Sequence, residues 1–379
     1  MRRAAARLGL VRLDEVELRR IALPFVTPFR TSFGTIVERD ILVVHVRSAA
    51  AEGWGECVAL GEPVYSAEWV GGAHEVLRRF LVPALLAAPD VCADDVAGRL
   101  AFVRGHQMAK AALEMAVVDA ELRSAGQSLA SRLGGARSRV EVGVSVGIAA
   151  SIAELVATVA GYVDAGYGRV KLKIGPGWDI EPVAAVRAHV GADVMLTVDA
   201  NCAYTGEDIE HLVRLDEHAL ALIEQPFGAD DLASHVALAA ATRTPVCLDE
   251  SIESLRDAAG AIDMGACSVV SIKPGRVGGY LEARRIHDLC MARDVAVWCG
   301  GMFETGIGRA ANLALASLPG FTLPGDISAS DRYYRTDITE PFVLQDGHIT
   351  VPTGPGIGVE PRLDVLDRVT TSIERLRRR

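Results

Sequence analysis

Six lysine and carboxylate side chains in the second half of the chain have the types and the spacing to form one reactive centre. Each stands at or near the end of a short apolar run that is typical of a β-strand. In chain order they are Lys171, Lys173, Asp199, Glu224, Asp249 and Lys273. Three carboxylates without histidine or cysteine partners suit a hard cation such as Mg²⁺ or Mn²⁺ rather than zinc. The sequence therefore predicts a divalent-metal site flanked by lysines.

This combination suits the removal of a proton from the carbon next to a carboxylate. That step creates an enediolate with two negative charges, which a divalent cation on the substrate carboxylate neutralises. A cation also lowers the pKa of a neighbouring lysine, whose neutral form then acts as a base. Lys171 and Lys173 share one strand face because side chains repeat every second residue. We expect Lys273 on the opposite side of the three carboxylates. Lysines on both sides can remove and return a proton from opposite faces.

The elements that position these residues recur at a nearly constant interval. Apolar runs alternate with alanine-rich helical stretches at a step of about 25 residues, the period of a strand–helix repeat. The runs cover residues 140–147, 169–175, 194–201, 220–226, 244–251, 267–274, 295–301 and a weaker 321–326. Parallel strands that are buried on both faces have such continuous apolar sequences. Eight units predict a βα barrel, in which the C-terminal strand ends gather the polar residues on one face.

The first third of the chain has a different pattern. Its opening is rich in β-branched residues, and three later stretches place apolar residues at helical spacing. These stretches are residues 67–87, 93–103 and 107–124. After residue 325 the repeat is lost, and the tail from Asp364 to Arg379 predicts a helix with a basic end. We divide the chain into an N-terminal domain, a barrel and a C-terminal segment: residues 1–136, 137–324 and 325–379.

The segment Pro24–Gly34 contains two prolines and a closing glycine, which predict a loop rather than a strand. Its phenylalanines recur at every fourth residue. They either anchor the loop to the body of the protein or form a lid over the substrate. For the lid we expect Phe25, Arg30 and Phe33 to be the functional residues.

Composition excludes several classes of protein. The chain has 379 residues, enough for about two domains or for one large barrel with an appendage. Its net charge of −10 argues against broad binding of nucleic acid or anionic membranes. No uninterrupted apolar stretch reaches about 18 residues, so a membrane span is not expected. The basic start lacks the apolar region of a secretory signal. Seven cysteines without metal-ligand spacing predict reduced thiols in a cytoplasmic protein.

Longer stretches of the sequence carry a resemblance. They are KLKIGPGWD (171–179), VDAN (198–201), IEQP (223–226), LDES (248–251), IKPGRVGGYLEARRIHD (272–288) and WCGGMFETGIGRAAN (298–312). The chain resembles the enolase superfamily in its muconate-lactonising branch, and within it the o-succinylbenzoate synthase / N-acylamino acid racemase family, above all the actinobacterial racemases. The resemblance runs from PFRTSFG (28–34) and GWGEC (53–57) to TLPGDISASDRYY (322–334).

The resemblance implies a modified TIM barrel, (β/α)7β, with an α+β capping domain built from the N-terminal segment and the C-terminal tail. It implies that Asp199, Glu224 and Asp249 ligate Mg²⁺, for which Mn²⁺ or Co²⁺ can substitute. Lys173 and Lys273 are then the two acid/base groups. The expected substrate is a small carboxylate, and the resemblance implies a homo-oligomer such as an octamer.

The remaining positions that match the family are expected to contact the substrate. They are Ser145, Lys171, Asn201, Gly301 and Met302. The implied reactions are racemisation of N-acetyl or N-succinyl amino acids and the dehydration that forms o-succinylbenzoate in menaquinone biosynthesis. Both share one catalytic set, so the sequence leaves them open.

Three other functions compete. A dipeptide epimerase or a muconate cycloisomerase would use the same barrel, but epimerases recognise an ammonium group with an acidic DxD-type motif, and the segment GGMFETG offers only Glu304. Lys273 could instead hold pyridoxal phosphate, which would leave the three carboxylates without a role. An inert ligand-binding barrel would not need the complete acid/base set.

Overall fold

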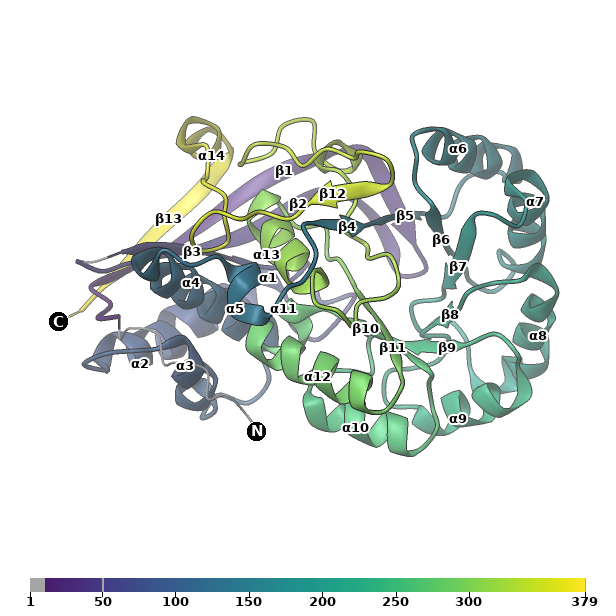
Figure 1. Cartoon of the computed structure of the whole chain (residues 1–379), viewed down its shortest axis with the longest axis horizontal. Helices are drawn as coiled ribbons and strands as arrows, with labels where there is room; N and C mark the ends of the chain where they lie inside the picture. Colours follow the sequence, from purple (N-terminus) through teal and green to yellow (C-terminus); the bar gives the residue numbers. More distant parts are fainter. Residues whose placement is uncertain (1–10, 50, 379) are drawn as a thin grey trace.

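The computed structural model describes residues 11–49 and 51–378, which form a curled parallel sheet ringed by helices and a separate antiparallel sheet (Figure 1). The parallel sheet has seven strands in the order β11-β10-β9-β8-β7-β6-β5. They are β5 (Gly143–Val146), β6 (Arg169–Lys173), β7 (Met195–Asp199), β8 (Ile223–Glu224), β9 (Val246–Leu248), β10 (Val269–Ile272) and β11 (Ala296–Cys299). Every apolar run predicted between residues 140 and 301 contains one of these strands. The predicted barrel fold class is confirmed.

The eighth run closes the barrel without forming a regular strand. Phe321 makes a single parallel bridge to Val297 on β11, and Gly325 makes one to Val142, the residue before β5. Pro324 lies between the two bridges and has no N–H to donate to a ladder. The run therefore joins the two edges of the sheet through isolated bridges.

Helices cover the outside of the parallel sheet (Figure 1). They are α6 (Ile152–Asp164), α7 (Ile180–Val190), α8 (Ile209–Val213), α9 (Leu232–Ala241), α10 (Leu255–Asp263), α11 (Pro274–Val277), α12 (Tyr280–Ala292) and α13 (Gly306–Ala316). Ser151 and Ser254 cap two of them, since each side chain accepts a hydrogen bond from the first-turn backbone. Among the described residues, no helix is long and apolar enough to cross a membrane.

The antiparallel sheet has the strand order β13-β1-β2-β3 and packs on a layer of helices; we call this unit the cap. Its strands are β1 (Glu15–Thr31), β2 (Gly34–Arg47), β3 (Glu52–Cys57) and β13 (Thr370–Arg377). Its helices are α1 (Val70–Val76), a π-helical turn (Leu77–Leu81), α2 (Val82–Ala87), α3 (Ala93–Leu100), α4 (Gln107–Ala125) and α5 (Leu129–Leu133). These helices confirm the predicted helical stretches. The domain boundaries at residues 136 and 324 stay a prediction.

The segment Pro24–Gly34 is a β-hairpin, so the prediction of a loop was wrong. β1 continues to Thr31 and β2 begins at Gly34, with Phe29 opposite Ile36. The register shifts between Pro24 and Phe29, where the ladder is interrupted. Proline is tolerated in strands at such bulges because no ladder hydrogen bond is needed there.

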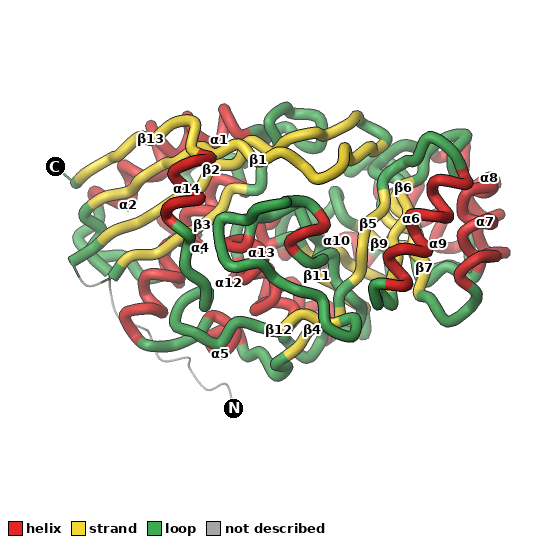
Figure 2. The backbone as a smooth tube through the Cα atoms, turned by 90° about the horizontal axis from the view of Figure 1, so that it is seen from above, coloured by secondary structure: helices red, strands yellow, loops and turns green. Residues whose placement is uncertain are grey.

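The predicted C-terminal helix is also wrong for most of its length. The chain forms α14 (Leu363–Val369) and then turns into β13, which pairs with β1 and brings the C-terminus into the cap (Figure 2). The basic residues of the tail bind carboxylates of β1: Arg375 Nε lies 2.8 Å from Glu17, and Arg377 Nε lies 2.6 Å from Glu15. The remaining short strands, β4 (Arg139–Glu141) and β12 (His348–Thr350), pair with each other.

Candidate active site

The predicted catalytic residues meet at the C-terminal edge of the parallel sheet. Lys173, Asp199 and Glu224 are the last residues of β6, β7 and β8, and the strand register places them side by side. Asp249 and Lys273 directly follow the last residues of β9 and β10. The carboxylates thus occupy three neighbouring strands, with one lysine strand on either side of them.

Each lysine donates to a carboxylate of this group. Lys173 Nζ lies 2.6 Å from Asp199 Oδ2 and 2.6 Å from Asn201 Oδ1. Lys273 Nζ lies 2.7 Å from Asp249 Oδ2 and 3.0 Å from the hydroxyl of Tyr65, which comes from the cap. The two lysines are therefore held on opposite sides of the carboxylates.

Lys171 lies deeper in the barrel. Its Nζ is 2.9 Å from Glu224 Oε2 and 3.1 Å from Asp199 Oδ2. Burial alone would lower the pKa of Lys171, but Asp326, Glu224 and Asp199 raise it well above its ordinary value. Lys171 is therefore a fixed cation beneath the site.

The carboxylates have the chemistry of a hard-cation site. The side chains of Asp199, Glu224 and Asp249 are at most 1% exposed. Glu224 Oε1 and Glu250 Oε2 are buried without a hydrogen-bond partner. Such oxygens lose the stabilisation of water, and a cation can restore it. Among the described residues, no three His, Cys, Asp or Glu side chains are already grouped so that they could hold a metal ion. Nitrogens of Lys173, Lys273 and Arg276 instead contact the carboxylate oxygens of Asp199 and Asp249.

The structure places the carboxylate of Asp249 beside the ammonium group of Lys273. Burial would lower the pKa of Lys273, but Asp249 raises it well above its ordinary value. Asp249 is affected in the opposite sense: burial would raise its pKa, but Arg276 and Lys273 lower it far below the usual range. The two groups form a buried ion pair.

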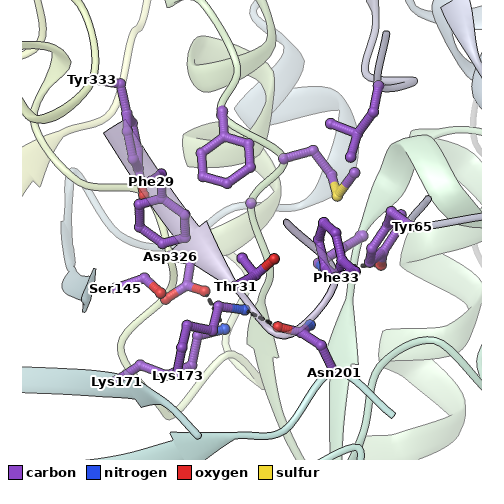
Figure 3. A pocket seen from close by; sticks show the side chains of 15 residues that line it. Phe29, Thr31, Phe33, Tyr65, Ser145, Lys171, Lys173, Asn201, Asp326 and Tyr333 are labelled. Atoms are coloured by element: carbon purple, nitrogen blue, oxygen red, sulfur yellow. Dashed lines mark hydrogen bonds and ion pairs between the residues drawn. The ribbon is translucent and has the colours of Figure 1, made fainter. Parts of the chain in front are cut away.

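A narrow cavity of about 40 Å³ opens above these residues (Figure 3). Polar groups from the barrel line one side, and aromatic rings face them: Phe29 with Tyr333, and Phe33 with Tyr65. All predicted acid/base and substrate residues line this cavity: Ser145, Lys171, Lys173, Asn201, Lys273, Gly301 and Met302. The hydroxyl oxygen of Ser145 is buried there without a protein partner.

The structure brings one of the three predicted lid residues to the cavity. Phe33 lines it at the tip of the β1–β2 hairpin. Phe25 instead packs on Phe303, with ring centroids 5.3 Å apart, and so anchors the hairpin. Arg30 has an exposed side chain; its backbone pairs with Thr35 in the hairpin, and its carbonyl accepts a hydrogen bond from the backbone N–H of Ile148 at 2.9 Å.

The loop after β11 approaches the cavity with its backbone. A methyl group on Gly301 would lie 2.4 Å from the carbonyl oxygen of Asp326, so only glycine fits there. Glu304, which the sequence offered as the acidic group of an epimerase, does not line the cavity. Its carboxylate accepts hydrogen bonds from the Met302 backbone at 2.9 Å and from Asn312 at 3.0 Å.

Several residues of the site were not predicted. Those that line the cavity are Phe29, Thr31, Leu60, Tyr65, Phe303, Asp326 and Tyr333. Two more contact residues of the site: Glu250 accepts a hydrogen bond from Asn201, and Arg276 pairs with Asp249. Asp326 was detectable, because it is the polar residue that ends the eighth run, as the other polar residues end theirs. Tyr65 comes from the connection between β3 and α1, where no periodic pattern marks it.

Comparison with known proteins agrees with this architecture. Residues 15–134 match the "Mandelate racemase / muconate lactonizing enzyme, N-terminal domain" family, and residues 154–365 match the "Enolase C-terminal domain-like" family. The chain is 60% identical to an N-succinylamino acid racemase of Amycolatopsis sp. over 96% of this chain and 98% of the relative. It is 46% identical to an o-succinylbenzoate synthase of Geobacillus stearothermophilus over 95% and 96%. A crystal structure of an enolase superfamily member from Listeria innocua superposes with a TM-score of 0.94, at 38% identity over 98% and 100%. The chain therefore belongs to the enolase superfamily, in its mandelate racemase / muconate lactonizing enzyme family.

Proposed function

We propose that this enzyme removes and returns the proton next to the carboxylate of an N-acylated amino acid, as a racemase, and that it also carries out the o-succinylbenzoate synthase dehydration. One observation carries the proposal: Lys173 and Lys273 flank three buried carboxylates from the two sides of the barrel mouth. The racemase of Amycolatopsis and the synthase of Geobacillus, at 60% and 46% identity, support this pair of reactions.

Enzymes of the enolase superfamily depend on a divalent metal ion. In this chain we propose Asp199, Glu224 and Asp249 as the ligands of Mg²⁺, with Mn²⁺ or Co²⁺ able to substitute. The bound cation supplies positive charge that stabilises the negative charge developing on the substrate carboxylate. The unpartnered buried oxygen of Glu224 supports this assignment.

The chain's own residues divide the remaining work. Lys173 takes the proton from one face of the α-carbon, and Lys273 delivers a proton to the other, which inverts the centre. Lys171 keeps a positive charge near the substrate carboxylate. The free hydroxyl of Ser145 and the amide of Asn201 are placed to hydrogen-bond substrate oxygens.

The rest of the pocket favours a neutral or acidic acyl group together with an apolar side chain. Phe29, Phe33 and Met302 supply the apolar walls. A free ammonium group would meet the lysines, and the pocket's own carboxylate, Asp326, is already paired with Lys171. The dipeptide epimerase alternative therefore lacks a free acidic group for an ammonium in this pocket.

Activity assays on one preparation test the proposal. Polarimetry on N-acetylmethionine, N-succinylphenylglycine and free methionine should show turnover of the acylated substrates only, and a parallel assay should show the synthase dehydration. A chelator should abolish both, and Mg²⁺, Mn²⁺ or Co²⁺ should restore them. Equal rates on free methionine would contradict the pocket assignment, and full activity after removal of all metal would contradict the mechanism.

We further propose a cytoplasmic homo-oligomer, with the octamer as the expected form. All seven cysteines are free thiols, which supports a reducing compartment. Light scattering coupled to size-exclusion chromatography measures the oligomeric state directly, and a monomer at micromolar concentration would contradict this part.

A further inference from the structure

Asp326, at the end of the eighth run, has no role in the mechanism described so far, yet it makes the shortest contact of Lys171. Asp326 lies beside Lys171 in the pocket (Figure 3). Its Oδ2 lies 2.5 Å from Lys171 Nζ, compared with 2.9 Å for Glu224 and 3.1 Å for Asp199. The ammonium group is thus shared among three carboxylates. Two of these three are proposed metal ligands.

Asp326 is fixed so that it cannot join those ligands. Its other oxygen, Oδ1, accepts a hydrogen bond from Arg169, which is itself buried. Its backbone N–H donates to Cys299 at 2.9 Å on β11, and the preceding carbonyl, of Gly325, accepts from Gly143 at 2.8 Å. The carboxylate is therefore held on the side of Lys171 that faces away from the metal-ligand strands.

An aromatic platform supports the same arrangement. The ammonium of Lys171 and the guanidinium of Arg169 each lie 4.7 Å from the centroid of the Trp298 ring inside the barrel. The indole N–H donates to Cys247 Sγ at 3.3 Å, which fixes the plane of the ring. Cations are attracted to the face of an indole ring, so Trp298 stabilises both groups in place.

A divalent cation on Asp199 and Glu224 would repel the ammonium that now contacts them. We propose that Asp326, oriented by Arg169, is the counter-ion that keeps Lys171 at the edge of the pocket when those carboxylates ligate the metal. Asp326 is thus a positioning residue: it acts through Lys171 and keeps the ammonium from competing with the metal. This inference rests on the proposed function, because it takes the metal ligands from there.

The test is a double-mutant cycle read out by calorimetric titration of Mn²⁺ into the metal-free protein, without substrate. In Asp326→Asn, Asp199 and Glu224 are the carboxylates that remain in contact with the ammonium, so we expect Mn²⁺ affinity to fall by about tenfold or more, the usual effect of losing a residue that supports a metal ligand. Asp326→Glu keeps the charge and should recover most of the affinity. In a Lys171→Met background, Asp326→Asn should change the affinity by less than about twofold.

Asp331→Asn is the matched control, since it removes the same charge from an exposed position five residues along the same segment. It should leave Mn²⁺ affinity unchanged. The proposal is overturned if Asp326→Asn binds Mn²⁺ like the unmodified protein, or if its effect persists in the Lys171→Met background, since Asp326 would then act on the metal directly. If Asp326→Asn does not fold, the test is the double variant Lys171→Met/Asp326→Asn, which removes both charges of the Lys171–Asp326 pair and is compared with Lys171→Met.

Activity separates this inference from the proposed function. For Asp326→Asn at saturating Mn²⁺ we expect a lower kcat for N-succinylphenylglycine with a smaller change in KM, because the charge of the displaced Lys171 stabilises the more negative transition state more than it stabilises the bound substrate. If the unmodified protein binds Mn²⁺ but racemises no N-acyl substrate, the substrate proposal fails while the calorimetric cycle still decides the role of Asp326. If the unmodified protein binds no divalent ion, both fail.

Discussion

The carboxylate of Glu56, at the end of β3, ties the cap to the barrel, and we predict that this tie weakens as the pH rises. Its oxygens accept hydrogen bonds from the Thr305 hydroxyl at 2.6 Å and from the backbone N–H groups of Thr305 and Gly308, each at 3.0 Å. Burial raises the pKa of Glu56 to about 7, against 4.5 for a free glutamate. Between pH 4.5 and about 7 the folded protein therefore holds a proton at this site that the unfolded chain releases.

The size of the effect follows from that difference in pKa. At about 1.36 kcal/mol per pH unit, a rise from 4.5 to about 7 corresponds to about 3 kcal/mol. Because the folded-state pKa is raised, this contribution to the free energy of unfolding is complete below pH 4.5 and is lost as the pH rises through about 7. Glu56→Gln cannot ionise, so its stability relative to the unmodified protein should improve by about 3 kcal/mol between pH 4.5 and pH 8.

Urea unfolding followed by circular dichroism at several pH values between 4.5 and 8 measures this difference. Glu210→Gln, at an exposed position, is the control and should track the unmodified protein at every pH. A constant difference between Glu56→Gln and the unmodified protein across this range would refute the reasoning. It would mean that the three hydrogen-bond donors keep Glu56 ionised in the folded state throughout.

Three further predictions concern the site and its support. Asp249→Asn should weaken Mn²⁺ binding by about tenfold or more in calorimetry, because a neutral amide is a poor ligand for a hard cation. Phe33→Ala should raise KM for aromatic N-acyl substrates with a change in stability below about 1 kcal/mol, whereas Phe25→Ala, which removes ring packing on Phe303, should cost about 2 kcal/mol in thermal unfolding. Gly55→Ala should destabilise by about 3 kcal/mol, because its methyl group would lie 2.0 Å from the backbone oxygen of Ala112; the control Gly161→Ala, in open space on α6, should stabilise by about 0.5–1 kcal/mol.

The sequence predicted the barrel and the central residues of the site because both follow from one rule. A buried parallel strand is mostly apolar until it leaves the sheet, so a charged residue that ends the strand marks the edge where a site can form. Lys173, Asp199 and Glu224 each end their strand, although β6 also carries Arg169 and Lys171 within the strand. The same rule applied to the eighth run points to Asp326, but Pro324 breaks the strand pattern before that residue is reached.

The parts that were not predicted depend on contacts between segments distant in sequence. The hydroxyl of Tyr65, in the cap, accepts a hydrogen bond from Lys273 in the barrel, and no motif around Tyr65 in the sequence indicates this contact. The tail from Thr370 to Arg377 has charges that suit a helix end. It nevertheless forms an edge strand, because its arginines form ion pairs with Glu15 and Glu17 of β1. The prolines of the β1–β2 hairpin resemble loop residues until the bulge that accommodates them is known.

The GWGEC motif shows why the cap and the barrel form one functional unit. Gly53 and Gly55 let β3 approach the backbone of α4, and that close packing fixes the strand inside the cap. The carboxylate of Glu56, the next residue of β3, accepts hydrogen bonds from backbone N–H groups at the start of α13. This helix directly follows the loop in which Gly301 lines the pocket. The position of this pocket wall therefore depends on how the cap packs, although every proposed acid/base and metal residue lies in the barrel. Substitutions in the cap core should consequently alter substrate preference before they alter proton transfer itself.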